Sequence, residues 1–322
     1  MKSDSSPAAR PGDRRAAADP HLAPGGQSAR SRFAPRPRAG LVLEARDEAL
    51  LRDLFRLRVL SRQQVQRLHY GSVSRCNRRL RQLFDGGYVA RHFPPAAPHN
   101  AQALYTLGPQ SLPRVRERLA ADGLEVTEED LRVQSRRPAL SLLEHALAIG
   151  DVYVALCLAL RDDPAAALAR WVPERLGWQE FEIRRAAGGG GGGAGRWRRE
   201  VFAPDAVFAL RCPSEDRHGT EVAPRWFVLE VDRGHVNARQ FRGKARVHRH
   251  VREAGLFGRL YGAAAFETLV VTTGERRLAN LWALARAEGG SHFRLTTFAR
   301  LAAGPLGPIW SQASPDERAC LL

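Results

Sequence analysis

The sequence feature that most narrows the range of folds is residues 226–251, WFVLEVDRGHVNARQFRGKARVHRHV. An apolar strand ends there in two acids, Glu230 and Asp232, and a turn and a lysine-bearing helix follow. Side chains alternate between the faces of a strand, so both carboxylates point the same way, with Cα atoms roughly 6.5–7 Å apart. Strands and helices that alternate in this way predict an α/β fold.

The surrounding region, residues 138–312, continues this alternation. An apolar helix begins at Pro138, a helix over about 237–254 lies between the last two expected strands, and another helix follows them. The order αβββαβα predicts a mixed sheet. The run Gly188–Gly193 lacks the lysine of a phosphate-binding loop, so we interpret it as a hairpin connection. The expected strands are 178–185, 197–210, 225–232 and 266–273.

Residues 44–108 contain three helical segments and then two short strands, the order of a winged helix-turn-helix. Ser61 is an expected N-cap with Gln64 at capping-box spacing, and Gly86 with Gly87 ends the third helix. The expected elements are helices over 47–60, 61–70 and 71–87 and strands over 88–93 and 103–108.

The third of these helices is basic, and residues 47–107 hold ten arginines against four acids, a surplus of +6. In a helix-turn-helix the second helix of the motif enters the major groove, where Arg and Asn contact guanine and adenine edges. This favours double-stranded DNA as the partner. The alternatives are a solvated arginine face and a winged helix that forms a homodimer or binds protein. The predicted DNA-binding residues are Arg75, Asn77, Arg78, Arg79 and Arg81, with Arg91 on the wing.

The chain as a whole has a formal net charge of +16 and a pI near 11.0. Lys2 and Lys244 are its only lysines, so arginine supplies the other 48 of 50 basic residues. This charge predicts attraction to polyanions, most simply nucleic acid. Residues 1–43 are a predicted disordered basic arm, 109–137 a bridging segment with two short helices, and 313–322 a C-terminal tail.

The most apolar helix, around residues 140–160, contains Glu144, His145 and Asp151. An acid near the bilayer centre costs about 2.5–3.5 kcal/mol even on a mild insertion scale, so we interpret this as a buried core helix. The N-terminus lacks the apolar core of a signal peptide, and the four cysteines lie far apart. We expect a cytoplasmic protein with reduced thiols and no membrane partner.

A third acid, Asp205, follows Pro204 at the start of another apolar strand. Together Asp205, Glu230 and Asp232 are candidate ligands of Mg²⁺, which accepts carboxylate oxygens while it retains waters. Lys244 falls inside the apolar arc of its helix, and a lysine can exchange protons where an arginine cannot. Its alternatives are a side chain that reaches the surface and a salt bridge with Asp232.

The pattern of Pro-Asp before one strand and E-x-D on the next resembles the PD-(D/E)xK nuclease superfamily. By that resemblance Asp205 and Glu230 match the metal-binding acids. Asp232 stands at the superfamily's lysine position, and Lys244 matches a lysine that has migrated to the helix.

A wider set of motifs, LEHALAIGDVYVAL, EVDRG, LVVTT and GPLGPIW, resembles the bacterial replication-relaxation family of plasmids and mobile elements over about residues 45–312. This resemblance implies a winged helix fused to a restriction-endonuclease-like α/β core. Two functions stay open. One is a Mg²⁺-dependent DNA endonuclease, and the other is a non-catalytic replication or transcription regulator with a degenerate nuclease fold. The candidate catalytic residues are Asp205, Glu230, Asp232 and Lys244.

Overall fold

The computed structural model describes residues 34–36, 40–93, 102–163, 166–185, 196–211, 223–312 and 314–322. The helices and strands given below all lie in one compact unit, Pro35–Leu322. Most of the expected basic arm and the run Gly188–Gly193 lie outside the described residues.

The N-terminal part of this unit combines three helices with a small antiparallel sheet in the order β1-β3-β2. Ser61 accepts a hydrogen bond from the backbone of Gln64, whose side chain accepts one in return, so the expected capping box is present. The third helix stops at Gly86, and Gly87 follows with φ of 72°. The elements are α1 (Ala45–Leu57), β1 (Leu60–Ser61), α2 (Arg62–His69), α3 (Val73–Asp85), β2 (Val89–His92) and β3 (Leu104–Leu107).

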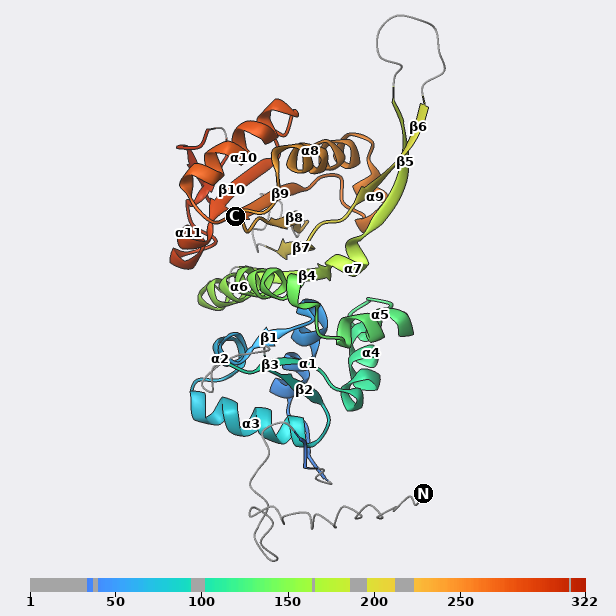
Figure 1. Ribbon diagram of the computed structural model, residues 1–322, viewed down its shortest axis with the longest axis vertical. Helices are drawn as coiled ribbons and strands as arrows, with labels where there is room; N and C mark the ends of the chain where they lie inside the picture. The colour runs from blue at the N-terminus through green and yellow to red at the C-terminus, as the bar shows by residue number, and fades with distance from the viewer. Residues whose placement is uncertain are drawn as a thin grey trace, which may run out of the picture. The chain divides into compact units, whose positions relative to one another are not determined.

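The bridging segment folds as two short helices after a 3-10 turn, as expected. It leads into helix α6. By length and composition alone, this helix is long and apolar enough to cross a membrane, with a mean hydropathy of 1.6 over 18 residues. Here α6 packs between the N-terminal helices and the sheet of the C-terminal part (Figure 1). The elements are η1 (Pro109–Ser111), α4 (Leu112–Ala121), α5 (Glu128–Ser135) and α6 (Leu140–Asp162).

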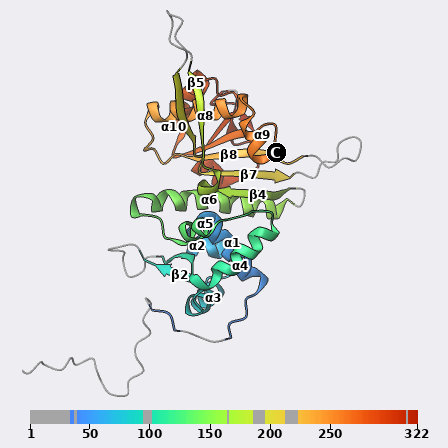
Figure 2. The same cartoon turned by 90° about the vertical axis from the view of Figure 1, so that its right-hand side faces the viewer.

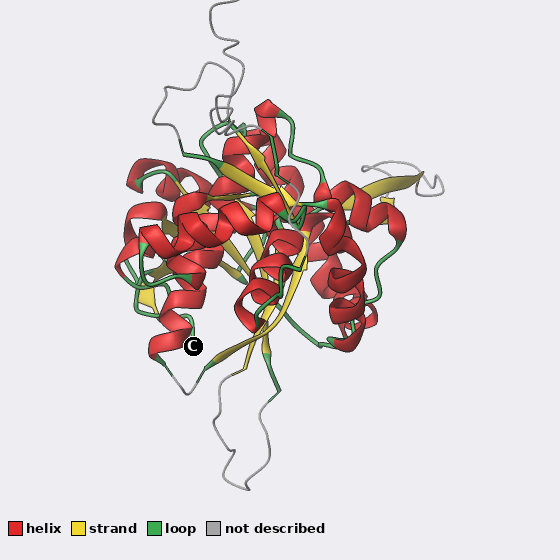
Figure 3. Cartoon of the chain, turned by 90° about the horizontal axis from the view of Figure 1, so that it is seen from below, coloured by secondary structure: helices red, strands yellow, loops and turns green. Residues whose placement is uncertain are grey.

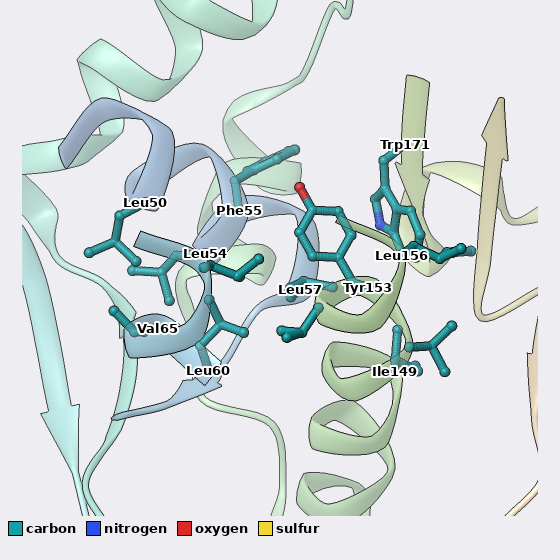
Figure 4. Packing of buried hydrophobic residues seen from close by; sticks show 14 of the residues in the cluster. Leu50, Leu54, Phe55, Leu57, Leu60, Val65, Ile149, Tyr153, Leu156 and Trp171 are labelled. Carbon is teal, nitrogen blue, oxygen red and sulfur yellow. The ribbon is translucent and has the colours of Figure 1, made fainter. Parts of the chain in front are cut away.

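The apolar side chains of α6 explain this position. Tyr153 lies between Leu57 of α1 and Trp171 of the sheet, and Leu156 lies beside Trp171 (Figure 4). Tyr153 also meets Trp171 edge-on, with ring centroids 4.8 Å apart. This packing is that of a core helix.

The expectation of a mixed sheet is confirmed by seven strands in the order β12-β11-β10-β9-β8-β7-β4. Strands β8, β9 and β10 run parallel, and their other neighbours are antiparallel. The strands are β4 (Ala167–Pro173), β7 (Ala206–Arg211), β8 (Arg225–Val231), β9 (Glu267–Thr272), β10 (Phe293–Thr297), β11 (Trp310–Ser311) and β12 (Arg318–Ala319).

Helices cover both faces of this sheet (Figures 1 and 3). Phe241 and Ala245 of α8 pack with Val270 of the sheet and Leu278 of α10, whereas Leu229 faces the cluster that contains α6. The helices are α7 (Glu174–Gly177), α8 (Ala238–Glu253), α9 (Leu256–Tyr261), α10 (Glu275–Ala287) and α11 (Phe298–Ala303).

Several strand expectations need correction. Strands β4, β10, β11 and β12 were not expected from the sequence, and the strand expected over 197–210 is two strands, β6 (Arg196–Phe202) and β7. The break falls at Pro204, which has no backbone N–H to donate to a ladder. Strand β6 pairs with β5 (Gln179–Arg185) in a separate two-stranded sheet. At the other end, β12 brings part of the expected tail into the main sheet.

Candidate functional site

Two of the candidate acids lie side by side at one end of the main sheet. Ala206 of β7 pairs with Leu229 of β8, and the N–H of Asp205 donates to the carbonyl of Leu229 at 3.0 Å. Asp205 therefore stands beside Glu230 on the neighbouring strand. Both are buried, with 7% and 5% of their surface exposed.

Asp205 is held by a backbone donor and a histidine. One carboxylate oxygen accepts from the N–H of Val231 at 2.6 Å, and the other lies 2.9 Å from Nε2 of His145 on α6. This hydrogen bond raises the pKa of His145 against the opposing effect of burial. His145 was interpreted from the sequence as part of a core helix, and its pairing with Asp205 was not foreseen.

Glu230 faces α8, where two basic side chains meet it. Nζ of Lys244 donates to Oε2, and Nε2 of His248 lies 3.0 Å from Oε1 but outside hydrogen-bond geometry. Burial alone would raise the pKa of Glu230, but the nearby Lys244 ammonium and His248 outweigh it and lower the pKa to about 2. Partial burial opposes the charged form of Lys244, but the charges of Glu230 and Asp205 outweigh it and raise the pKa of Lys244.

Asp232 points to the same face of the sheet as Glu230, as strand alternation predicts, but it meets a different helix. Arg277 of α10 donates two hydrogen bonds to the Asp232 carboxylate, of 2.8 and 3.0 Å, and the Thr272 hydroxyl donates a third at 2.7 Å. Burial opposes ionisation, but these hydrogen bonds lower the pKa of Asp232. The alternative pairing of Lys244 with Asp232 is therefore wrong, because Lys244 bonds Glu230.

Next to Asp205 opens a cavity of about 710 Å³, which α5, α6, α7 and the end of α1 help to line. Glu174 of α7 lies in its wall, and burial followed by the charge of Asp205 raises the pKa of this carboxyl group. Glu174, like Arg277, was missed in the sequence because nothing local distinguishes it from a surface residue.

The three-acid arrangement does not fit a bound divalent cation as the side chains stand. Each carboxylate already meets protein donors or cations. Only 4% of Asp232 is exposed, which leaves little room beside this carboxylate for the waters that Mg²⁺ retains. Across the described part of the chain, no group of three or more His, Cys, Asp or Glu side chains is placed to hold a metal ion.

The second candidate site is the outer face of α3. Arg75, Asn77 and Arg78 are exposed there, after a helix start that Ser72 caps. Cys76 and Leu80 point into the core, so the exposed residues share one face.

The remaining predicted DNA-binding arginines have partners within the protein. Nε of Arg79 lies 3.0 Å from Asp47, and Nε of Arg81 lies 2.9 Å from Asp85. Arg91 on β2 lies over the ring of Phe84, with Cζ 4.5 Å from its centroid. The prediction of a DNA-contacting helix therefore depends on Arg75, Asn77 and Arg78.

These features define a basic α+β protein with a small helix–sheet module and a mixed sheet whose end carries acid–base pairs. The profile of the replication-relaxation family matches residues 51–265, more than half of the chain, and the chain belongs to this family. Membership suggests a role in the replication or relaxation of plasmid or mobile-element DNA. No curated protein and no solved structure matches the sequence.

Proposed function

We propose that this protein binds double-stranded DNA in the cytoplasm and acts as a non-catalytic factor in plasmid or mobile-element replication. Its family and its net charge of +16 support this proposal. The observation that carries it is the exposed face of α3, where Arg75, Asn77 and Arg78 have the side chains that contact base edges and phosphates.

The N-terminal module is, in this proposal, a winged helix-turn-helix. The order of three helices before the β2–β3 pair supports it, as does a third strand, β1, between α1 and α2. Helix α2 then precedes α3 in the helix-turn-helix, and α3 enters the major groove. The wing follows α3 in the chain.

The C-terminal part is, in this proposal, a degenerate nuclease-like core. Asp205 and Glu230 on adjacent strands, with Lys244 bonded to Glu230, support the likeness to the PD-(D/E)xK pattern. Protein cations already neutralise the carboxylates, with Lys244 at Glu230 and Arg277 at Asp232. A divalent ion is then not needed to offset their repulsion.

The second candidate function is a Mg²⁺-dependent endonuclease, which the closeness of Asp205, Glu230 and Lys244 favours. It requires the carboxylates to exchange their present partners for the ion. Incubation of supercoiled and linear DNA with the wild-type protein and Mg²⁺ or Mn²⁺ separates the two functions. We expect binding without cleavage. Cleavage that Asp205→Asn and Lys244→Met both abolish would establish the nuclease.

The binding proposal is tested with a fluorescently labelled duplex and the variant Arg75→Ala/Arg78→Ala. We expect the variant to lose affinity while its circular dichroism and unfolding curve stay those of wild type. Unchanged affinity in a folded variant would show that α3 does not face DNA.

A further inference from the structure

The β5–β6 ribbon, Gln179–Arg185 with Arg196–Phe202, is not part of the main sheet. Its two strands pair in seven cross-strand positions, from Gln179 opposite Phe202 to Arg185 opposite Arg196. Figures 1 and 2 both show it extending away from the sheet and α8.

The near end of this ribbon is anchored in the core. Phe202 is fully buried, and Phe181 stacks on His250 of α8 with ring centroids 5.5 Å apart. These residues share one face, since opposite pairs and alternate positions point the same way. The anchor fixes the direction in which the far end projects.

Charge is divided sharply along the ribbon. The four near pairs, from Gln179–Phe202 to Glu182–Arg199, contain three glutamates and one arginine. The three far pairs contain four arginines, one tryptophan and one isoleucine, with no acid. At about 3.3 Å per residue, these pairs extend the basic end by roughly 10 Å. The far residues are Ile183, Arg184, Arg185, Arg196, Trp197 and Arg198.

Two of these residues, Trp197 and Arg198, have exposed side chains. Trp197 is 62% exposed, and Arg198 is 61% exposed although its Nε lies 3.3 Å from Glu200. Tryptophan is one of the residues enriched where proteins contact partners, because it offers a large apolar surface with a polar N–H. Arginines beside an apolar side chain fit the major groove of duplex DNA, which offers phosphates, guanine edges and thymine methyl groups.

We propose that the far end of the β5–β6 ribbon, Ile183–Arg185 with Arg196–Arg198, is a second contact with duplex DNA. A two-stranded ribbon has the width that the major groove admits. Figures 1 and 2 place α3 and this ribbon on opposite sides of α6, so the ribbon meets a different segment of DNA from α3. This inference rests on the proposed DNA-binding function.

The test compares two variants that each remove four positive charges. In the ribbon variant, Arg184, Arg185, Arg196 and Arg198 become Gln. In the control, four exposed arginines of α8, α9 and α10 become Gln: Arg239, Arg242, Arg259 and Arg276. We expect the ribbon variant to bind a labelled duplex about tenfold or more weakly near 0.15 M salt, with a salt slope shallower by up to about 3.6. The control should change much less.

Trp197 supplies a second readout. Saturating duplex should reduce the quenching of tryptophan fluorescence by acrylamide in the wild type, and Trp197→Phe should remove that difference. Equal reductions of affinity in both charge variants, or protection that persists in Trp197→Phe, would overturn the inference. So would unchanged duplex affinity in a ribbon variant that no longer binds single strands or vesicles with anionic lipid.

The Arg75→Ala/Arg78→Ala variant keeps the two proposals distinguishable. If it loses affinity for the duplex while the ribbon variant binds as tightly as the wild type, the ribbon inference fails and the proposed function stands. If the wild type binds no DNA, the proposed function itself fails.

Discussion

Nε of Arg79 on α3 donates to both carboxylate oxygens of Asp47 on α1, at 3.0 Å from Oδ1 and 3.2 Å from Oδ2. Asp47 is fully buried, and the same arginine donates to the carbonyl of Val42 at 2.8 Å. This ion pair joins the basic helix to the first helix of the module. Arg79 is thus a structural residue in a row of candidate DNA-binding side chains.

Replacing Arg79 by Ala should therefore lower stability more than it alters DNA binding. The change leaves a buried carboxylate without its cation, which costs about 3 kcal/mol. Urea unfolding should show this destabilisation, whereas Arg78→Ala, on the exposed face, should stay within about 0.5 kcal/mol of wild type. Equal stabilities for the two variants would contradict the role given to Arg79.

Glu230 should make the protein sensitive to acid. Its pKa is about 2 in the folded protein against an ordinary 4.5, so its contribution to stability is present above about pH 4.5 and is lost as pH falls toward 2. Asp232, with a lowered pKa, acts in the same direction. The free energy of unfolding should fall less steeply between pH 5 and 3 in Glu230→Gln. Parallel curves for variant and wild type would count against the Lys244–Glu230 pair.

His145 should titrate at a higher pH than an ordinary histidine, because Asp205 stabilises its charged form. Its contribution to stability is present below the unfolded pKa, near 6.5, and is lost as pH rises through the folded value. An NMR titration should place the pKa of His145 above 6.5, and Asp205→Asn should lower it. A pKa that does not respond to Asp205→Asn would rule out the pairing.

Millimolar Mg²⁺ should leave the melting temperature of the DNA-free protein unchanged relative to EDTA, since a ligand stabilises only the state that binds it. The carboxylates of Asp205, Glu230 and Asp232 already have partners within the protein. A rise in melting temperature that both Asp205→Asn and Glu230→Gln remove would instead support the endonuclease.

Much of the fold could be predicted because local patterns determine it. Helix α8 begins at the capping box of Asn237 and Gln240, and the strand of Glu230 follows from its apolar run. Strand β4 was missed because its first half, ALAR, is largely exposed and rich in alanine, and only its second half is buried. The break at Pro204 is visible in the sequence, because a proline inside an apolar run argues against one continuous strand. That β6 pairs with β5 in a separate sheet depends on tertiary packing, which the sequence pattern does not show.

For the candidate site, the sequence predicted only which way side chains point within one strand or one helix. Alternation placed Glu230 and Asp232 on one face, and the helical arc turned Lys244 inward. Which cation meets which acid depends on how α8 and α10 pack on the sheet, so the Arg277–Asp232 pair was not foreseen. Likewise, Arg79 meets a carboxylate 32 positions away, and His145 meets one 60 positions away.

The most direct test of DNA binding through α3 is the dependence of duplex affinity on salt concentration. We expect the logarithm of the association constant of wild type to fall linearly with the logarithm of salt concentration. The slope of Arg75→Gln/Arg78→Gln should be shallower by up to about 1.8, or about 0.9 for each phosphate that the variant no longer neutralises. Lower affinity at unchanged slope, with relaxed sequence preference, would assign these arginines to bases instead. Identical affinity and slope in the folded variant would contradict the proposed function of α3.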